Sequence, residues 1–269
     1  MEYLGYGLSV IIGISLGLIG GGGSILTVPV LVYVMGISPV LSTAYSLFIV
    51  GLTALVGSVE YGRKKLLDYK TALIFGIPSI VAVYSTRKFL VPVIPDPVFH
   101  IGSFELTKNL FVMLLFAILM VAASISMIRD KKKSDDCEPK EKRYNLPLIF
   151  VEGLLVGTLT GLVGAGGGFL IIPALVLLAG LPMKQAVGTS LLIIGVKSLI
   201  GFLGDIGHQA IDWKFLLTFS AFAIVGIFVG TQLARRISGD KLKPAFGWFV
   251  LIMGIYILIK EIFFQTPVM

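Results

Sequence analysis

The fold of this chain is limited above all by its long apolar stretches. Seven of them lie near residues 40–60, 70–86, 108–128, 146–163, 184–204, 213–234 and 244–264, and a longer one runs from Tyr3 to Met35. A helix that crosses the hydrocarbon core of a bilayer needs about 20 mostly apolar residues. Charged residues make up only 14% of the 269, against roughly a quarter in soluble domains. The pattern therefore predicts an all-α polytopic membrane protein.

The chain is also an internal repeat. A shift of 144 residues aligns 17–57 with 161–201 without a gap, and 16 of these 41 positions are identical. The identical pairs include Gly20/Gly164, Gly22/Gly166, Gly23/Gly167, Pro29/Pro173, Gly36/Gly180 and Ser46/Ser190. Shared apolar composition would not place glycine, proline and serine in register. We therefore predict a first membrane repeat over 1–128, a charged linker over 129–145 and a second membrane repeat over 146–269.

The basic residues predict how the two repeats are oriented. Seven Lys and Arg lie between Arg129 and Arg143, which places the linker in the cytoplasm. Inverted repeats then put the basic loops at 63–65 and 235–243 in the cytoplasm too, whereas parallel repeats put 235–243 outside. We therefore predict two inverted-topology repeats, each with a glycine-broken hairpin helix followed by about three spanning helices. Both termini are predicted outside.

The glycine runs explain how the longer apolar stretch fits. Residues 3–35 would form a helix about 50 Å long, against a hydrocarbon core of about 30 Å. The segment must therefore fold back, with the glycines at the tip of a hairpin. We expect new helices to start at Ser24, as an N-cap, and near Gly168. Pro29 and Pro173 fall in the first turns of these helices and are expected to kink or shorten them.

Two such breaks could frame one anion site. Non-helical backbone inside a membrane occurs where protein or a water-filled cavity surrounds it, and free N–H groups at a helix N-terminus favour an anion. The predicted substrate-binding residues are Gly20, Gly21, Gly22, Gly23, Ser24, Ser46, Gly164, Ala165, Gly166, Gly167, Gly168, Thr189, Ser190 and Lys197. The alternative is that the glycines serve only close helix packing.

Few other polar residues lie within the spans. Lys197 falls on the same helical face as Ser190, and it could bind the anion, pair with Glu152, or extend its ammonium group to the membrane surface. Asp68 and Asp212 recur at the start of equivalent spans, which favours a structural role at helix N-termini. The two histidines are too isolated for a metal site, so we expect no metal and no cofactor.

Several classes of function are excluded. The glycine runs are followed by no GK[ST] motif and lie in no βαβ unit, so they are not nucleotide-binding loops. We find no nucleophile–base pair, which argues against an enzyme. The positive charge lies mainly in loops, which indicates orientation in the lipid bilayer rather than nucleic-acid binding. Because no ATP-binding motif is present, any energy coupling would use an ion gradient, and the sequence leaves open whether that ion is a proton, sodium or neither. A passive anion channel and a membrane scaffold or sensor are the alternatives, and the oligomeric state is not predicted.

The motifs resemble one family of membrane transporters. "GLIGGGGSILTVPVL" at 17–31, "GLVGAGGGFLIIPAL" at 161–175, "VGTS" at 187–190 and the D-aromatic-K sequences at 68–70 and 212–214 are similar to those of the sulfite exporter TauE/SafE family. The resemblance covers nearly the whole chain. It implies a carrier in a bacterial-type inner membrane for sulfur-containing oxyanions, such as sulfite, sulfoacetate or related organosulfonates.

Overall fold

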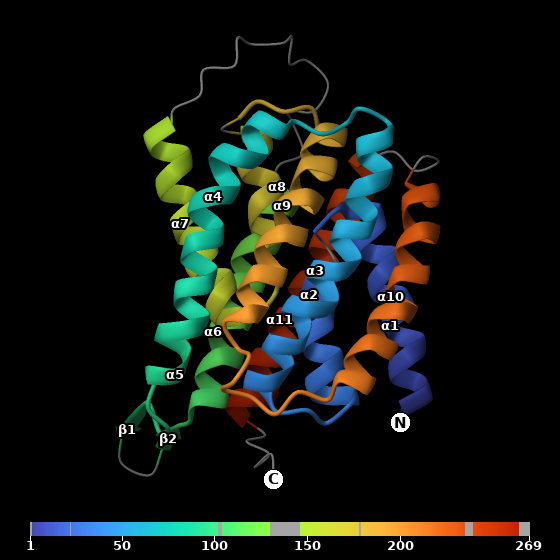
Figure 1. Cartoon of the computed structure of the whole chain (residues 1–269). Coiled ribbons are helices and arrows are strands. Elements are labelled where there is room, and N and C mark those ends of the chain that lie inside the picture. The colour runs from blue at the N-terminus through green and yellow to red at the C-terminus, as the bar shows by residue number, and fades with distance from the viewer. Residues whose placement is uncertain are drawn as a thin grey trace.

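The computed structural model describes residues 2–21, 23–101, 104–129, 146–177, 179–234 and 239–263, and nearly all of them are helical (Figure 1). The first half contains α1 (Glu2–Ile19), α2 (Gly23–Pro29), the π-helix η1 (Val30–Val34), α3 (Pro39–Arg63), α4 (Tyr69–Ser85), the π-helix η2 (Thr86–Leu90), α5 (Val91–Val93) and α6 (Lys108–Arg129). A hairpin of β1 (Phe99–Ile101) and antiparallel β2 (Phe104–Leu106) precedes α6. The second half contains α7 (Leu146–Val163), α8 (Gly168–Leu177), α9 (Met183–Leu203), α10 (Trp213–Leu233) and α11 (Gly239–Phe263).

Five helical segments in the described part of the chain are long and apolar enough to cross a bilayer. They are Pro39–Arg63, Tyr69–Val93, Lys108–Ile125, Met183–Leu203 and Trp213–Leu233. The chain is therefore an all-α multi-pass membrane protein, as predicted. The charged linker lies outside the described residues, apart from Arg129 at the end of α6.

One span is longer than the apolar stretch near residues 70–86 predicted. The helical segment continues through η2 and α5 to Val93, because apolar residues resume at Phe89 after a single basic pair. This extension places Arg87 inside the bundle, where its side chain is fully buried.

Helix packing follows the repeat. The main contacts pair α1 with α10 and α4 with α7, which are equivalent pairs under the shift of 144 residues. Further contacts join α3 to its counterpart α9, α6 to its counterpart α11, and the equivalent pairs α4 with α9 and α10 with α3. In Figure 1, α4 descends toward the β-hairpin end of the molecule while its counterpart α10 rises from that end. These two equivalent helices therefore run in opposite directions.

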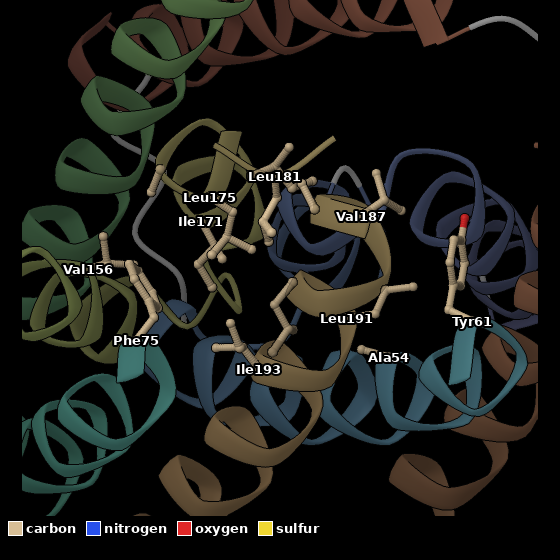
Figure 2. Packing of buried hydrophobic residues seen from close by; sticks show 14 of the residues in the cluster. Ala54, Tyr61, Phe75, Val156, Ile171, Leu175, Leu181, Val187, Leu191 and Ile193 are labelled. Atoms are coloured by element: carbon tan, nitrogen blue, oxygen red, sulfur yellow. The ribbon is translucent and has the colours of Figure 1, made fainter. Parts of the chain in front are cut away.

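A buried apolar cluster holds the second half against the first. Figure 2 shows it around α8 and α9, where Ile171 and Leu191 lie near side chains from other helices. These neighbours are Ala54 and Tyr61 of α3, Phe75 of α4 and Val156 of α7. The short helix α8 is therefore fixed in place by both repeats rather than by its own half alone.

Equivalent aspartates begin α4 and α10. The side chain of Asp68 accepts a hydrogen bond of 3.0 Å from the N–H of Thr71, and Asp212 accepts one of 3.0 Å from the N–H of Phe215. Each aspartate also uses its own N–H to reach the other repeat: Asp68 donates to Thr189 Oγ1 at 3.0 Å, and Asp212 donates to Tyr45 Oη at 2.7 Å. Because Tyr45 and Thr189 are themselves repeat equivalents, the two helix starts are fixed in the same way.

This geometry predicts a modest loss of stability when the N-cap is removed. Asp212→Ala removes the side-chain cap of α10 and should lower the free energy of unfolding by about 1 kcal/mol. The helix start should stay in place, because the Asp212 N–H still reaches Tyr45. Thermal melts of the variant and of wild type measure the difference, and an unchanged melting midpoint would contradict a capping role for Asp212.

Candidate functional site

The first glycine break turns the chain back on itself. α1 ends at Ile19, and Gly20 has a φ of 74°, a left-handed conformation that favours glycine. α2 then starts at Gly23, which packs so closely on Ile12 and Leu16 of α1 that a Cβ at Gly23 would overlap them. The two helices therefore form the predicted hairpin. Gly22 lies outside the described residues.

The second break is tighter and contains more left-handed residues. Gly164, Gly166 and Gly167 have φ values of 71°, 63° and 73°. The N–H of Gly164 donates to the Thr160 carbonyl at 2.8 Å, and the N–H of Gly167 donates to the Ala165 carbonyl at 2.6 Å. α8 begins at the next residue, and the N–H groups of Leu170 and Ile171 both donate to the Gly167 carbonyl at 3.0 Å, so the helix starts directly from this turn.

The two breaks meet inside the bundle. The backbone of Gly21 lies against the backbone of Gly168, and a Cβ on either residue would overlap the other. A Cβ at Gly166 would also lie 3.4 Å from Cβ of Ser24. Close packing of the two breaks is therefore one function of Gly21 and Gly168.

Equivalent faces of α3 and α9 line the breaks. Gly164 contacts Thr43 of α3, and Gly20 contacts Val187, the equivalent residue of α9. A Cβ at Gly166 would lie 2.8 Å from Val50 Cγ1 and 3.2 Å from Ile194 Cγ2, another equivalent pair. Continued at helical spacing, these faces comprise Thr43, Ser46, Val50 and Thr53 on α3, and Val187, Ser190, Ile194 and Lys197 on α9. Three predicted site residues, Ser46, Ser190 and Lys197, thus share the faces that line the breaks.

The hydroxyl groups near the breaks have different partners. Ser24 was predicted to be an N-cap, and this is wrong: α2 starts one residue earlier, so Ser24 sits in the first turn and donates to the Gly21 carbonyl at 2.7 Å. Ser190 donates to the Val187 carbonyl at 2.8 Å. Ser46 Oγ is buried and has no hydrogen-bond partner within the described ranges. Thr189 is engaged with Asp68 at the start of α4.

The two prolines have unequal effects on the helices that follow the breaks. At Pro29 the α-helix ends and the π-helical turn η1 begins, so α2 has only seven residues. At the equivalent Pro173 the helix continues, and α8 runs to Leu177. The expected shortening therefore occurs at Pro29, where the helix type changes, and no such change occurs at Pro173.

Lys197 is fully buried beside the second break. Its Nζ donates to Thr160 Oγ1 at 3.1 Å and lies 3.0 Å from the position that a Cβ at Gly167 would occupy. The idea that its ammonium group extends to the membrane surface is therefore wrong. Pairing with Glu152 is also wrong, because the ion pairs of the described residues are Glu60–Lys64 and Arg87–Asp205. Its repeat equivalent is the neutral Thr53, so the positive charge belongs to one side of the site.

Sequence reasoning missed two residues of this region. Thr160, one turn before the second break, has the apolar Leu16 as its equivalent, so the repeat gave no signal for a hydroxyl there. Arg87 donates from Nη1 to Thr43 Oγ1 at 3.0 Å, and Thr43 is the residue that contacts Gly164. The apolar residues after Arg87 and Lys88 were the available signal that the span continues.

A cavity of about 580 Å³ opens elsewhere, between the α4–η2 segment and α7. It is lined by Val81, Ala82, Ser85, Thr86, Phe89, Leu90, Val93, Leu154 and Thr158. None of the predicted site residues belongs to this lining. The breaks themselves are closely packed in this conformation, so a solute could enter between them only if the helices separate.

A multi-pass helical bundle with two broken helices that meet inside it is the architecture of a membrane transporter, and the comparisons with known proteins agree. The family model described as "Sulfite exporter TauE/SafE" matches residues 6–257. This chain belongs to that family of membrane transporters.

Three relatives illustrate the match. A "Probable membrane transporter protein" of Xylella fastidiosa is 31% identical over 92% of this chain and 91% of its own length. YunE of Bacillus subtilis, a "Probable membrane transporter protein", is 28% identical over 91% of this chain and 93% of its own. MJ0441 of Methanocaldococcus jannaschii, with the same description, is 36% identical over 41% of this chain and 44% of its own. No solved structure matches the chain.

Proposed function

We propose that this protein is a secondary transporter, and specifically an exporter, of small sulfur-containing oxyanions such as sulfite or organosulfonates. The observation that carries the proposal is the ammonium group of Lys197, buried against the second glycine break. A buried cation is costly unless charge and hydrogen bonds compensate it, and among the described residues Nζ has one hydroxyl as its hydrogen-bond acceptor. A bound oxyanion would supply the compensating charge.

The second break adds to the electrostatic argument. The N-terminus of α8 begins at Gly168, directly after Gly167, which adjoins Lys197 Nζ. Helix N-termini carry partial positive charge and free N–H donors. An oxyanion between the breaks would thus meet a full charge and a helix terminus on the same side. The family name supports sulfite as the first substrate to test. The proposal also includes coupling of transport to a proton or sodium gradient. It places the protein in a bacterial-type inner membrane.

We also propose that the chain forms two inverted-topology repeats, with both termini outside. Support comes from the equivalent packing of α1 on α10 and of α7 on α4, and from the opposite directions of α4 and α10 in Figure 1. Inversion also places the basic loop at 63–65 on the same side as the linker, which agrees with the positive-inside bias.

Cysteine labelling tests this topology. Arg63 is exposed at the end of α3, and His208 is exposed in the loop that follows α9, the repeat equivalent of α3. We expect Arg63→Cys to react with a membrane-impermeant maleimide only from the cytoplasmic side and His208→Cys only from the outside, each in a Cys137→Ser background. The unsubstituted Cys137→Ser protein is the control for background labelling. Reaction of both cysteines from the same side would contradict inverted repeats.

Counterflow in proteoliposomes tests the transport proposal. Vesicles loaded with unlabelled sulfite should take up radiolabelled sulfite faster than empty vesicles, because a carrier must return its site and does so more readily when loaded. An organosulfonate should substitute for sulfite on the inside, and gluconate should not. Repeating the assay with an imposed proton or sodium gradient identifies the coupling ion. Uptake that does not depend on the internal anion would indicate a channel, and no uptake of any oxyanion would refute the proposal.

A further inference from the structure

A second buried cation lies at the β-hairpin end of the bundle. Arg87 belongs to η2, which follows α4 and leads into α5 (Figure 1), and none of its side chain is exposed. Its Nη1 donates to Thr43 Oγ1 at 3.0 Å and lies 3.4 Å from both carboxylate oxygens of Asp205. Its Nε and Nη2 are also buried and have no hydrogen-bond partner among the residues that the structure describes.

The ion pair leaves the stronger donor edge of Arg87 unused. Nε and Nη2 lie on the same side of the guanidinium group and present two parallel N–H donors, which suits bidentate binding of an oxyanion. Hydrogen bonds between charged partners are normally 2.7–2.9 Å long, so the distance of 3.4 Å from Nη1 to Asp205 is a loose contact. Burial raises the pKa of Asp205 in spite of the neighbouring guanidinium, which indicates that Arg87 compensates this carboxylate incompletely.

Contacts connect this cluster to the glycine breaks. Thr43, which accepts the hydrogen bond from Arg87, packs on Gly164 at the start of the second break. Thr86, the neighbour of Arg87 in the chain, packs on Gly161 one turn earlier in α7. The guanidinium group is thus one packed residue away from the region where we place the transported anion.

The opposite end of the bundle has no equivalent cation at this position. The repeat equivalent of Arg87 is Thr231, whose hydroxyl donates to Glu60 Oε2 at 3.1 Å. A carboxylate therefore occurs at both ends, but a guanidinium group occurs at this place in one repeat only. The pseudo-symmetric packing does not require Arg87, since a threonine fills the same place in the other half.

We propose that the Nε–Nη2 edge of Arg87 is a second binding site for an oxyanion, and that Asp205, at Nη1, is an internal carboxylate that competes with the anion for the charge of the same guanidinium group. The inference rests on the proposed function and extends it: a sulfite or sulfonate group binds Arg87 at the β-hairpin end before or after it occupies the site beside Lys197.

Sulfite titrations of four proteins test this site. Wild type, Asp205→Asn, Arg87→Lys and Glu60→Gln are reconstituted in nanodiscs of zwitterionic lipid, and the thermal midpoint is followed against sulfite concentration. Asp205→Asn removes the competing carboxylate, and we expect the half-saturating sulfite concentration to fall about tenfold. Arg87→Lys keeps the charge but loses the parallel donors, so the half-saturating concentration should rise about tenfold. Glu60→Gln removes a carboxylate from the other end and should leave it unchanged.

The outcomes separate this inference from the proposed function. If no protein responds to sulfite, the proposed function fails. If wild type responds and both Asp205→Asn and Arg87→Lys match it, only the Arg87 site is refuted. Should Asp205→Asn unfold during purification, sulfite in the buffer should restore it, and failure to do so would also refute the site. A midpoint that rises with phosphatidylglycerol in the nanodisc but not with sulfite would assign the edge to a lipid headgroup and overturn a solute site.

Discussion

Lys197→Met should abolish sulfite counterflow while leaving the amount of folded protein unchanged. Methionine has a similar volume and no charge, and replacing a buried charged group by an apolar one of similar size is often neutral or stabilising. Loss of one charged contact worth about 2 kcal/mol weakens anion binding roughly 30-fold, and a buried site without its cation should lose more. The expected result is therefore transport at the background rate from a protein that melts at or above the wild-type midpoint.

The matched control is Lys184→Met, which makes the same substitution in the same helix. Lys184 is exposed near the start of α9, so its loss should leave counterflow at the wild-type rate. Normal transport by Lys197→Met would show that the buried ammonium group does not bind the solute. A protein that fails to accumulate would instead make the hydrogen bond from Lys197 to Thr160 a structural requirement.

Gly166→Val should also stop transport, for a geometric reason. Gly166 has a φ of 63°, which a β-branched residue adopts only with strain. A side chain there would also press against Val50 and Ile194 and fill the space between the breaks. The same substitution at the equivalent Gly22 should have the same effect on transport, because one site framed by two breaks requires both.

Gly180→Val is the control that distinguishes backbone strain at a left-handed glycine from a side chain that fills the space between the breaks. Gly180 has a φ of 62°, and apart from its chain neighbours no atom of the described residues lies within 4 Å of the position of an added Cβ. It therefore carries a similar backbone strain, of order 1–3 kcal/mol, without filling the breaks. We expect it to melt at a lower temperature and to transport normally per folded molecule. Equal transport by Gly166→Val and Gly180→Val would show that the glycines serve packing and conformation only.

The sequence predicted the parts of this fold that depend on local pattern. Apolar length identified the spans, the identical glycines and prolines revealed the repeat, and the excess length of residues 3–35 required a hairpin at Gly20–Gly23. The repeated aspartates pointed to the starts of α4 and α10, where Asp68 and Asp212 now accept N–H bonds. Each of these inferences needs only the chain's own spacing and the thickness of a bilayer.

Contacts between distant segments could not be predicted in the same way. Thr160 became relevant only when α7 was placed beside α9, 37 residues away in the chain. Arg87 pairs with Asp205 across 118 residues, and neither residue has a charged repeat equivalent. Ser24 matched the preference for N-cap residues, but α2 starts one residue earlier, at Gly23. The sequence therefore predicted the charged residue of the candidate site, Lys197, but it could not predict which residues contact Lys197.

The most direct test of the central claim is sulfite binding followed by thermal melts of wild type, Lys197→Met and Gly166→Val. A ligand that binds only the folded protein raises its stability by RT ln(1 + [L]/Kd), or about 2.7 kcal/mol at one hundred times Kd. We predict a midpoint that rises with sulfite for wild type and a clearly smaller rise for either variant at the same concentrations, because only the proposed Arg87 site would remain. Variants that shift with sulfite as wild type does would contradict an anion site between the two glycine breaks.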